Sequence, residues 1–217
     1  PNADNGRFDL SIDGSVLASA VGNGGTTNQR EVTVGLHTIG QAPATDTDAA
    51  DYLTSVSCVE ARTNAVITPD AQGRVPVQNG EDVVCTYSNN RKGTVNIDKE
   101  VNGGTGPAAW KYAGTLGSFT LPAAGGQQSF ANLQPGVYTV SEQITGDWYV
   151  RSLACSDPDG GTNVTVFEGV AAVDMDAGEA VTCTFVNRYS PPSIAFDKSV
   201  SSAAVYPNTP VTYTFVA

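Results

Sequence analysis

Lys99, Glu142 and Asn187 continue the apolar side of three alternating runs, VNIDK, YTVSE and CTFVN. Alternate residues of a β-strand share a face, so each of these polar residues lies on the same side as the apolar residues of its run. We therefore expect an amine, a carboxyl group and a carboxamide to point into one core. Polar groups in such a place need partners.

An amine and a carboxamide held in one core can form an amide bond with loss of ammonia. Burial disfavours charge, so it favours a neutral, nucleophilic Lys99 and a protonated Glu142 that polarises the Asn187 carbonyl. This reaction would happen once per molecule and would give a staple rather than turnover. The alternative explains each residue alone: Lys99 reaches solvent, Glu142 starts a turn and Asn187 caps a loop.

The composition favours an all-β protein as the scaffold for these residues. Only 15% of the residues are charged, and runs rich in Leu, Glu and Lys, which favour helices, are missing. Short runs with β-propensity alternate with Gly, Asn and Asp, as expected for strands joined by turns. We see no convincing helix.

An internal repeat divides the chain into modules. YLTSVSC at 52–58 matches YVRSLAC at 149–155, and GEDVVCTYSN at 80–89 matches GEAVTCTFVN at 178–187. The copies are separated by about 100 residues, the size of one immunoglobulin-like β-sandwich. The sequence therefore predicts tandem immunoglobulin-like β-sandwich modules in a row.

A shared opening run marks where each module starts. VNIDKEV at 95–101 is echoed by IAFDKSV at 194–200 and by LSIDGSV at 10–16. We predict a first module at 1–91, a second at 92–190 and an incomplete third at 191–217. The linkers are short, and the Pro191-Pro192 pair favours a stiff, extended spacer.

The four cysteines follow the repeat, with one pair in each module. Four cysteines allow three pairings, of which Cys58 with Cys85 and Cys155 with Cys183 is the most economical. Such disulfides indicate an oxidising compartment and hence an exported protein. The alternative is four free, buried thiols. Zinc is disfavoured because there is no CxxC pair and His37 is the only histidine.

The charge excludes some classes of partner. The formal net charge is -11, with a pI near 4.3, whereas nucleic acids and anionic membranes attract basic proteins. The sequence shows no apolar stretch long enough to span a bilayer and no signal peptide, and it starts with Pro1. We expect a processed or excised piece of a longer polypeptide.

The second module resembles a known family through GTVNIDKEVNGG, GSFTLPAAGGQQSFANLQPGVYTVSE, GDWYVRSLACSD and GEAVTCTFVN. Over about residues 93–190 it is similar to the SpaA-like prealbumin-fold, or Cna B-type, repeats of bacterial surface proteins. The resemblance implies a prealbumin-like sandwich with an intramolecular isopeptide bond. The family's lysine, assisting glutamate and asparagine fall on Lys99, Glu142 and Asn187.

The other modules depart from this pattern. In the first, Asn89 matches Asn187, but Gly14 stands in the place of Lys99 and the stretch VTVGLH offers no glutamate, so we expect no cross-link there. From Pro191 the chain resembles the start of a DUF11-type repeat, with PPSIAFDKSV followed by VTYTFVA. Its two strands either belong to a longer chain that is cut here or are donated to a neighbouring subunit.

Other candidate sites are weaker. Asp157 and Asp159 in DPDGGTN gather oxygen ligands that suit calcium, although an ordinary Asp-Gly turn is the simpler interpretation. The tryptophans and adjacent tyrosines offer a possible sugar-stacking patch, with core packing as the alternative. We predict no cofactor and no active site.

These observations lead to a structural function as the first hypothesis. The chain would be a module of an exported bacterial cell-surface protein, in a stalk, fibre or adhesin shaft, stabilised by disulfides and an isopeptide bond. One alternative is a filament subunit joined by donated C-terminal strands; another is an adhesin module that binds a glycan or host protein, and a third is a hydrolase accessory segment. Expected partners are copies of the chain, neighbouring modules, or surface molecules, without direct membrane insertion.

Overall fold

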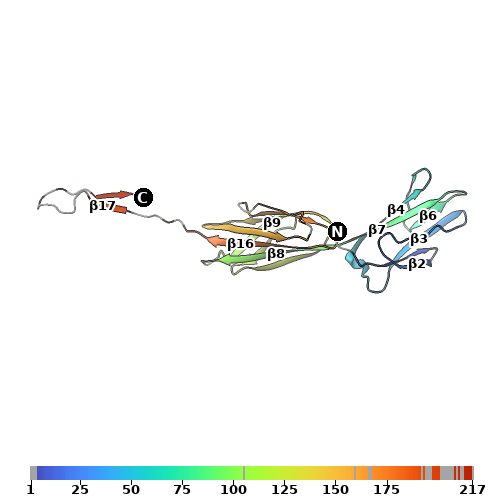
Figure 1. Ribbon diagram of the computed structural model, residues 1–217, viewed down its shortest axis with the longest axis horizontal. Coiled ribbons are helices and arrows are strands. Elements are labelled where there is room, and N and C mark those ends of the chain that lie inside the picture. Colours follow the sequence, from blue (N-terminus) through green and yellow to red (C-terminus); the bar gives the residue numbers. More distant parts are fainter. Residues whose placement is uncertain are drawn as a thin grey trace.

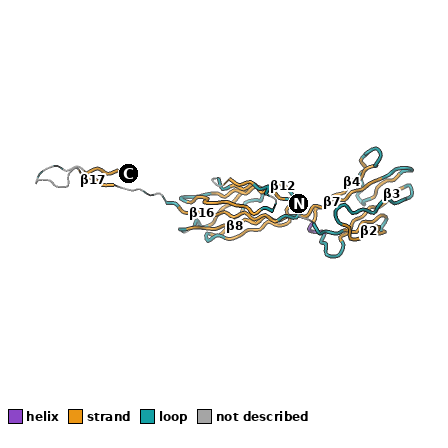
Figure 2. The backbone as a smooth tube through the Cα atoms, in the orientation of Figure 1, coloured by secondary structure: helices purple, strands orange, loops and turns teal. Residues whose placement is uncertain are grey.

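The computed structural model describes residues 4–104, 106–158, 160–165, 168–191, 193, 197–200, 208, 210 and 213–216, leaving aside the side chains of 164, 197–200 and 213–216. Strands and their connecting loops make up nearly all of this (Figure 2). Two β-sandwiches follow one another along the long axis (Figure 1). The predicted class of tandem β-sandwich modules is confirmed. No helix in the described parts is long and apolar enough to cross a membrane.

The first module contains two antiparallel sheets. The larger has the order β2 (Ser15–Val21), β1 (Phe8–Ile12), β3 (Gly35–Pro43), β6 (Arg74–Val77). The smaller has the order β5 (Val66–Ile67), β4 (Tyr52–Glu60), β7 (Val83–Arg91). Asp13 and Gly14 form the two-residue turn between β1 and β2, with φ of 51° and 77°, as a tight hairpin requires. A short 3₁₀ turn, η1 (Ala49–Asp51), precedes β4.

The second module has two larger sheets. One has the order β10 (Phe119–Pro122), β9 (Ala109–Gly114), β12 (Gly136–Gln143), β15 (Val170–Met175), β14 (Asn163–Thr165). The other has the order β11 (Gly126–Leu133), β8 (Gly93–Asn102), β16 (Ala180–Tyr189), β13 (Trp148–Ser156). The first and last strands of the module, β8 and β16, pair in parallel. All other pairs in this module are antiparallel.

Alternating sequence produces the core of the second module. Every second residue of β8 and β16 is buried, as the period of two in the sequence predicts. Trp110 on β9 meets Trp148 on β13 edge to face across the sandwich, with ring centroids 5.2 Å apart. Fifteen apolar residues are buried in this cluster, compared with four in the described part of the first module: Phe8, Tyr52, Cys58 and Val75.

The two modules are joined by a single residue, Lys92, between β7 and β8. Its backbone N–H donates to Asp51 O at 2.8 Å and its Nζ donates to Ala50 O at 2.9 Å, so both bonds go to the first module. From the second module, Gly178 N–H donates to Arg91 O at 2.9 Å. The junction is therefore held from both sides.

The topology corrects one sequence alignment. LSIDGSV was expected to be the opening strand equivalent to VNIDKEV, but β1 pairs with β3 just as β9 pairs with β12. Residues 8–12 are thus the counterpart of β9, and Gly14 in the following turn is not the counterpart of Lys99. The amphipathic pattern of LSIDGSV was identified correctly, but the pattern does not determine which sheet a strand joins.

Beyond the second module, β17 (Asp197–Val200) and β18 (Tyr213–Val216) pair antiparallel in a two-stranded sheet. Most other residues of the expected DUF11-type opening lie outside the described residues. The DUF11 assignment stays a prediction.

Candidate functional site

The three polar residues singled out in the sequence come together inside the second module. Lys99 lies on β8, Asn187 on the adjacent β16, and Glu142 on β12 of the facing sheet. Each is buried, with exposed fractions of 4%, 0% and 3% respectively. Their shared position follows from strand parity, which places all three on interior faces.

One carboxyl oxygen contacts both prospective partners of the cross-link. Lys99 Nζ lies 2.9 Å from Glu142 Oε1, and Asn187 Nδ2 donates to the same oxygen at 2.7 Å. The side chains of Lys99 and Glu142 are completely shielded from solvent. The lysine therefore does not reach solvent, and Glu142 does not act as a surface turn residue.

One aromatic ring packs against the amine, and a second aromatic residue lies beside Glu142. Lys99 Nζ lies 4.1 Å from the centroid of the Trp110 ring, within the range of a cation–π contact. The Trp110 ring is held by its Nε1–H, which donates to Ala123 O at 3.2 Å. Tyr112 is the register partner of Glu142 and is 2% exposed. The site is a small polar cluster in an apolar core.

Burial shifts the protonation of both charged groups toward the neutral form. It lowers the pKa of Lys99 to about 8, although Glu142 opposes the shift. It raises the pKa of Glu142 above its ordinary value, with Lys99 and Asn187 opposing. Burial also raises the pKa of Tyr112, reinforced by the charge of Glu142. The geometry therefore supports a neutral amine beside a protonated carboxyl group.

Two acceptors at the site are unused. Glu142 Oε2 and Asn187 Oδ1 are buried and have no hydrogen-bond partner among the described residues. Leaving a buried polar group unpaired costs about 1–3 kcal/mol. If Glu142 carries a proton, its carboxyl group becomes a hydrogen-bond donor in a cluster where the carbonyl oxygen of Asn187 is an unused acceptor.

The first module has a related pair that the sequence analysis overlooked. Asn89 Nδ2 donates to Gln41 Oε1 at 2.9 Å, and Gln41 Nε2 donates to Asn89 Oδ1 at 2.9 Å. Thr54 Oγ1 also donates to Asn89 Oδ1, at 2.7 Å. GLHTIGQ at 35–41 matches GVYTVSE at 136–142, so Gln41 stands where Glu142 does. This match is the sequence signal that identifies Gln41 as the counterpart of Glu142. The stretch VTVGLH, in which a glutamate was sought, ends before Gln41.

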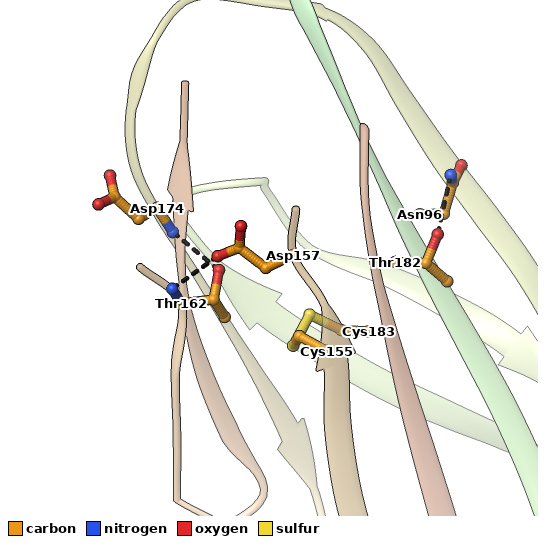
Figure 3. Close-up of a disulfide and its surroundings, with 7 residues drawn as sticks. All are labelled: Asn96, Cys155, Asp157, Thr162, Asp174, Thr182 and Cys183. Carbon is orange, nitrogen blue, oxygen red and sulfur yellow. Dashed lines mark hydrogen bonds between the residues drawn. A yellow bond between two sulfur atoms is a disulfide. The ribbon is translucent and has the colours of Figure 1, made fainter. Parts of the chain in front are cut away.

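The cysteines form the two pairs expected from the repeat, Cys58 with Cys85 and Cys155 with Cys183. In each pair the two residues are direct register partners on neighbouring antiparallel strands, with Cα atoms 4.0 Å apart. Figure 3 shows the second disulfide bridging β13 and β16. Closing loops of this length stabilises by roughly 3–4 kcal/mol in the chain-entropy account.

The turn that follows this disulfide uses Asp157 for backbone hydrogen bonds. Its Oδ2 accepts from Thr162 N–H at 2.7 Å and its Oδ1 from Gly160 N–H at 3.2 Å (Figure 3 draws the first). Asp159 lies outside the described residues. Across the residues with described positions, no three His, Cys, Asp or Glu side chains gather as a metal site. The geometry at Asp157 is that of a turn.

Two family models match the chain, and both describe a prealbumin-like fold domain of the SpaA type. One matches residues 95–189 and the other residues 3–91. From the sequence motifs alone, the resemblance is apparent in the second module and, in the first, only around the cysteines. The match at 3–91 extends it across the first module.

Solved structures show a more distant similarity. A bacterial adhesin from Mobiluncus mulieris, described as containing intramolecular disulfide, isopeptide and ester bond cross-links, is 14% identical with a TM-score of 0.38 in each of two crystal forms. The alignments cover 71% and 86% of this chain and 67% and 86% of the adhesin chains. The Bacillus anthracis TIE protein is 13% identical, with a TM-score of 0.33, over 87% of this chain and 35% of its own. Such TM-scores are too low to transfer a domain arrangement. No curated protein matches the sequence.

Proposed function

Because this chain contains two SpaA-type prealbumin-like domains, we propose that it is a structural part of an exported bacterial cell-surface protein. It serves in a stalk, fibre or adhesin shaft, with modules at 1–91, 92–190 and an incomplete one at 191–217. Its partners are neighbouring modules of the same surface polypeptide. The observation that carries the proposal is the buried contact of Lys99 and Asn187 with one oxygen of Glu142.

The proposed reaction joins Lys99 Nζ to Asn187 Cγ. Neutral Lys99 attacks the carboxamide carbon, the Cγ–Nδ2 bond breaks, and Nδ2 leaves as ammonia. The amine gives up one proton and the leaving nitrogen gains one, so the balance closes without another reactant. Glu142 starts protonated and polarises the Asn187 carbonyl by giving up its own proton to it, which frees the carboxyl group to take up the amine proton. Because Glu142 Oε1 contacts both nitrogens, it can then deliver a proton to the leaving nitrogen.

The position of this bond suits a protein that bears load. Tension enters the second module through β8 and leaves through β16, the first and last strands. An amide between Lys99 and Asn187 would carry the force directly from one strand to the other. Residues 100–186 would then be shielded from extension, while the disulfide between Cys155 and Cys183 stabilises the fold within the shielded part.

The test is the intact mass of the folded chain after reduction. We expect a mass lower than that of the sequence by one ammonia, and Lys99→Ala should restore the full mass. Lys111→Ala removes an exposed lysine from β9 and serves as the matched control, which should keep the deficit. A deficit that persists in Lys99→Ala would assign the lost ammonia elsewhere and end this proposal.

A glycan-binding function has less support in this geometry. Trp110 and Trp148 are 1% and 8% exposed, so their ring faces are packed in the core. They do not form the surface patch that sugar stacking would require. We therefore place the function in the shaft, and the location outside the cell.

A further inference from the structure

The first module has an open sheet edge where the second module is closed. β16 lies between β13 and β8, whereas β7, its counterpart, pairs only with β4 among the described strands. The interior residues of β16 are completely buried: Val181, Cys183, Phe185 and Asn187. Their counterparts on β7 are only half-buried: Val83, Cys85, Tyr87 and Asn89. No described strand occupies the place beside β7 that β8 occupies beside β16.

A second segment pairs with no described strand at the same place. In the second module, β11 follows β10 and pairs with β8. The corresponding residues of the first module, 26–34 after β2, form no strand, although the run QREVTV includes β-favouring residues. Val32 and Val34 in this segment are 39% and 67% exposed. One missing strand would explain both the open edge of β7 and the irregular 26–34 segment.

A groove of about 970 Å³ lies between these two elements. Its walls include Ile12 and Ile39 from one sheet, and Val83 and Tyr87 from the other. The 26–34 segment contributes to its lining. In the second module, the corresponding interior is filled by Val95 and Ile97 of β8, which are both 0% exposed.

The start of the described chain lies at the end of the groove where a β8-like strand would leave it. β8 runs parallel to β16 and ends beside Arg188. Just after it, Gly104 lies so close to Trp148 that a Cβ added to Gly104 would come within 3.2 Å of the tryptophan ring. In the first module, Gly6 packs so closely on Tyr52 that a Cβ would collide with its hydroxyl. Tyr52 Oη also donates to Asp4 Oδ1 at 2.8 Å.

Tyr52 and Trp148 hold equivalent positions at the first residues of β4 and β13, each opposite the end of the last strand of its module. The stretch from Asp4 to Gly6 therefore occupies the place of the connection that follows β8. A strand running parallel to β7 would end where Asp4 begins.

We propose that the first module is completed by one further β-strand, supplied by the same polypeptide on the amino-terminal side of Asp4. The strand runs parallel to β7, lies between β7 and the 26–34 segment, and presents apolar residues to the groove at alternate positions. Main-chain hydrogen bonds to the open edge of β7 and to the 26–34 segment supply affinity, and the groove sets the register.

This strand is held without a covalent bond. The side chain that faces Asn89 from the strand meets Gln41, whose amide replaces the carboxyl group of Glu142. An amide cannot relay the proton that leaves the amine, so ammonia is not lost even when the strand carries a lysine. Binding of the strand to the first module is thus reversible, whereas the proposed amide between Lys99 and Asn187 would close the second module permanently.

The test extends the full chain by a copy of residues 93–101 in place of residues 1–3. Hydrogen–deuterium exchange is measured at the amides of 83–89 and 26–34 and compared with the unextended chain. We expect exchange to slow by at least about tenfold at both segments. The matched control carries V95D and I97D within the copy only, and its exchange should equal that of the unextended chain.

Three results would overturn the inference. In the first, the extended chain and its control exchange equally at 83–89. In the second, the unextended chain forms multimers at high concentration that protect the same amides, so that a second copy is the occupant. In the third, the extended chain loses a second ammonia, which would show covalent closure. Loss of one ammonia tests the Lys99–Asn187 bond separately, so the two proposals fail independently.

Discussion

The two modules share a fold and a disulfide position but differ in how their interiors are closed. In the second, β8 lies beside β16, and fifteen apolar residues are buried around the Lys99 site. In the first, β7 is an edge strand among the described residues, and Asn89 is paired with Gln41. An asparagine at the end of the last strand is therefore not enough for a cross-link. The proposed cross-link also requires a neighbouring amine and a buried carboxyl group.

The two polar sites differ in the chemistry of their groups, and under the proposed function this difference makes only the second one reactive. Gln41 and Asn89 form two reciprocal hydrogen bonds between neutral amides, which satisfies them without a proton transfer. Lys99 and Glu142 are ionisable groups without solvent, so burial moves both toward neutral forms. The same scaffold thus holds a stable amide pair in one module and a pair suited to proton transfer in the other.

The largest effect should appear under mechanical load. Asn187→Ala removes the carboxamide that would accept the cross-link, so the second module should extend fully when a single molecule is pulled from its ends. In the unmodified chain we expect no extension of residues 100–186. Force spectroscopy measures the gain in contour length directly. Asn89→Ala, the matched change in the first module, should leave the second module's trace unchanged.

The next largest effect should come from removing the disulfides, which should destabilise the two modules to different extents. Cys58→Ser with Cys85→Ser should cost the first module roughly 3–4 kcal/mol, a large share of the stability expected for a small domain. The same pair of changes at Cys155 and Cys183 should leave the second module folded because the proposed amide would still tie β8 to β16. Urea unfolding followed by tryptophan fluorescence reports the second module alone, since both tryptophans lie there. Circular dichroism also detects the unfolding of the first module. Equal unfolding of both modules would contradict the proposed difference.

Much of the site was predictable from strand parity, because a period of two decides which face each residue occupies. This sufficed to bring Lys99, Glu142 and Asn187 into one core, while the internal repeat indicated which cysteines pair. It did not reveal that β1 belongs beside β3, since an amphipathic run fits either sheet and the choice depends on residues far away in the chain. The open edge of β7 was missed for the same reason.

The rate of cross-linking should depend on pH in the second module. The pKa of Lys99 is lowered to about 8, so the neutral amine becomes more abundant as pH rises toward that value. Between pH 6 and 7 the rate should rise about tenfold, because neutral amine grows tenfold per pH unit below its pKa. Glu142, whose pKa is raised, must still carry its proton, so the rate should fall again at higher pH. Mass spectrometry of freshly refolded chain follows the loss of ammonia. A flat profile would contradict this protonation scheme.

The smallest effect should be confined to the first module and to His37. Its Nδ1 lies 2.7 Å from Asp13 Oδ2 and its Nε2 lies 2.7 Å from Thr33 O, so only the protonated ring donates to both. The hydrogen bond to Asp13 and then that to Thr33 raise the pKa of His37 above 6.5. The stabilisation is complete below pH 6.5 and is lost as pH rises through the raised value.

His37→Gln should remove this pH dependence, which thermal unfolding of the first module between pH 5 and 8 would reveal. The second module contains no histidine and should show no such step. An unchanged profile in His37→Gln would assign the dependence to another group.

The single-residue junction has a consequence for the distance that such a protein can span. Lys92 is bonded back into the first module, and Gly178 of the second donates to Arg91. A Cβ at Gly178 would come within 3.1 Å of Arg91 Cδ, so a side chain there would crowd Arg91. A flexible linker lets separation grow only as the square root of its length. Units joined in this way would instead add their lengths, and each further one would project the outermost unit a full domain length farther from the cell.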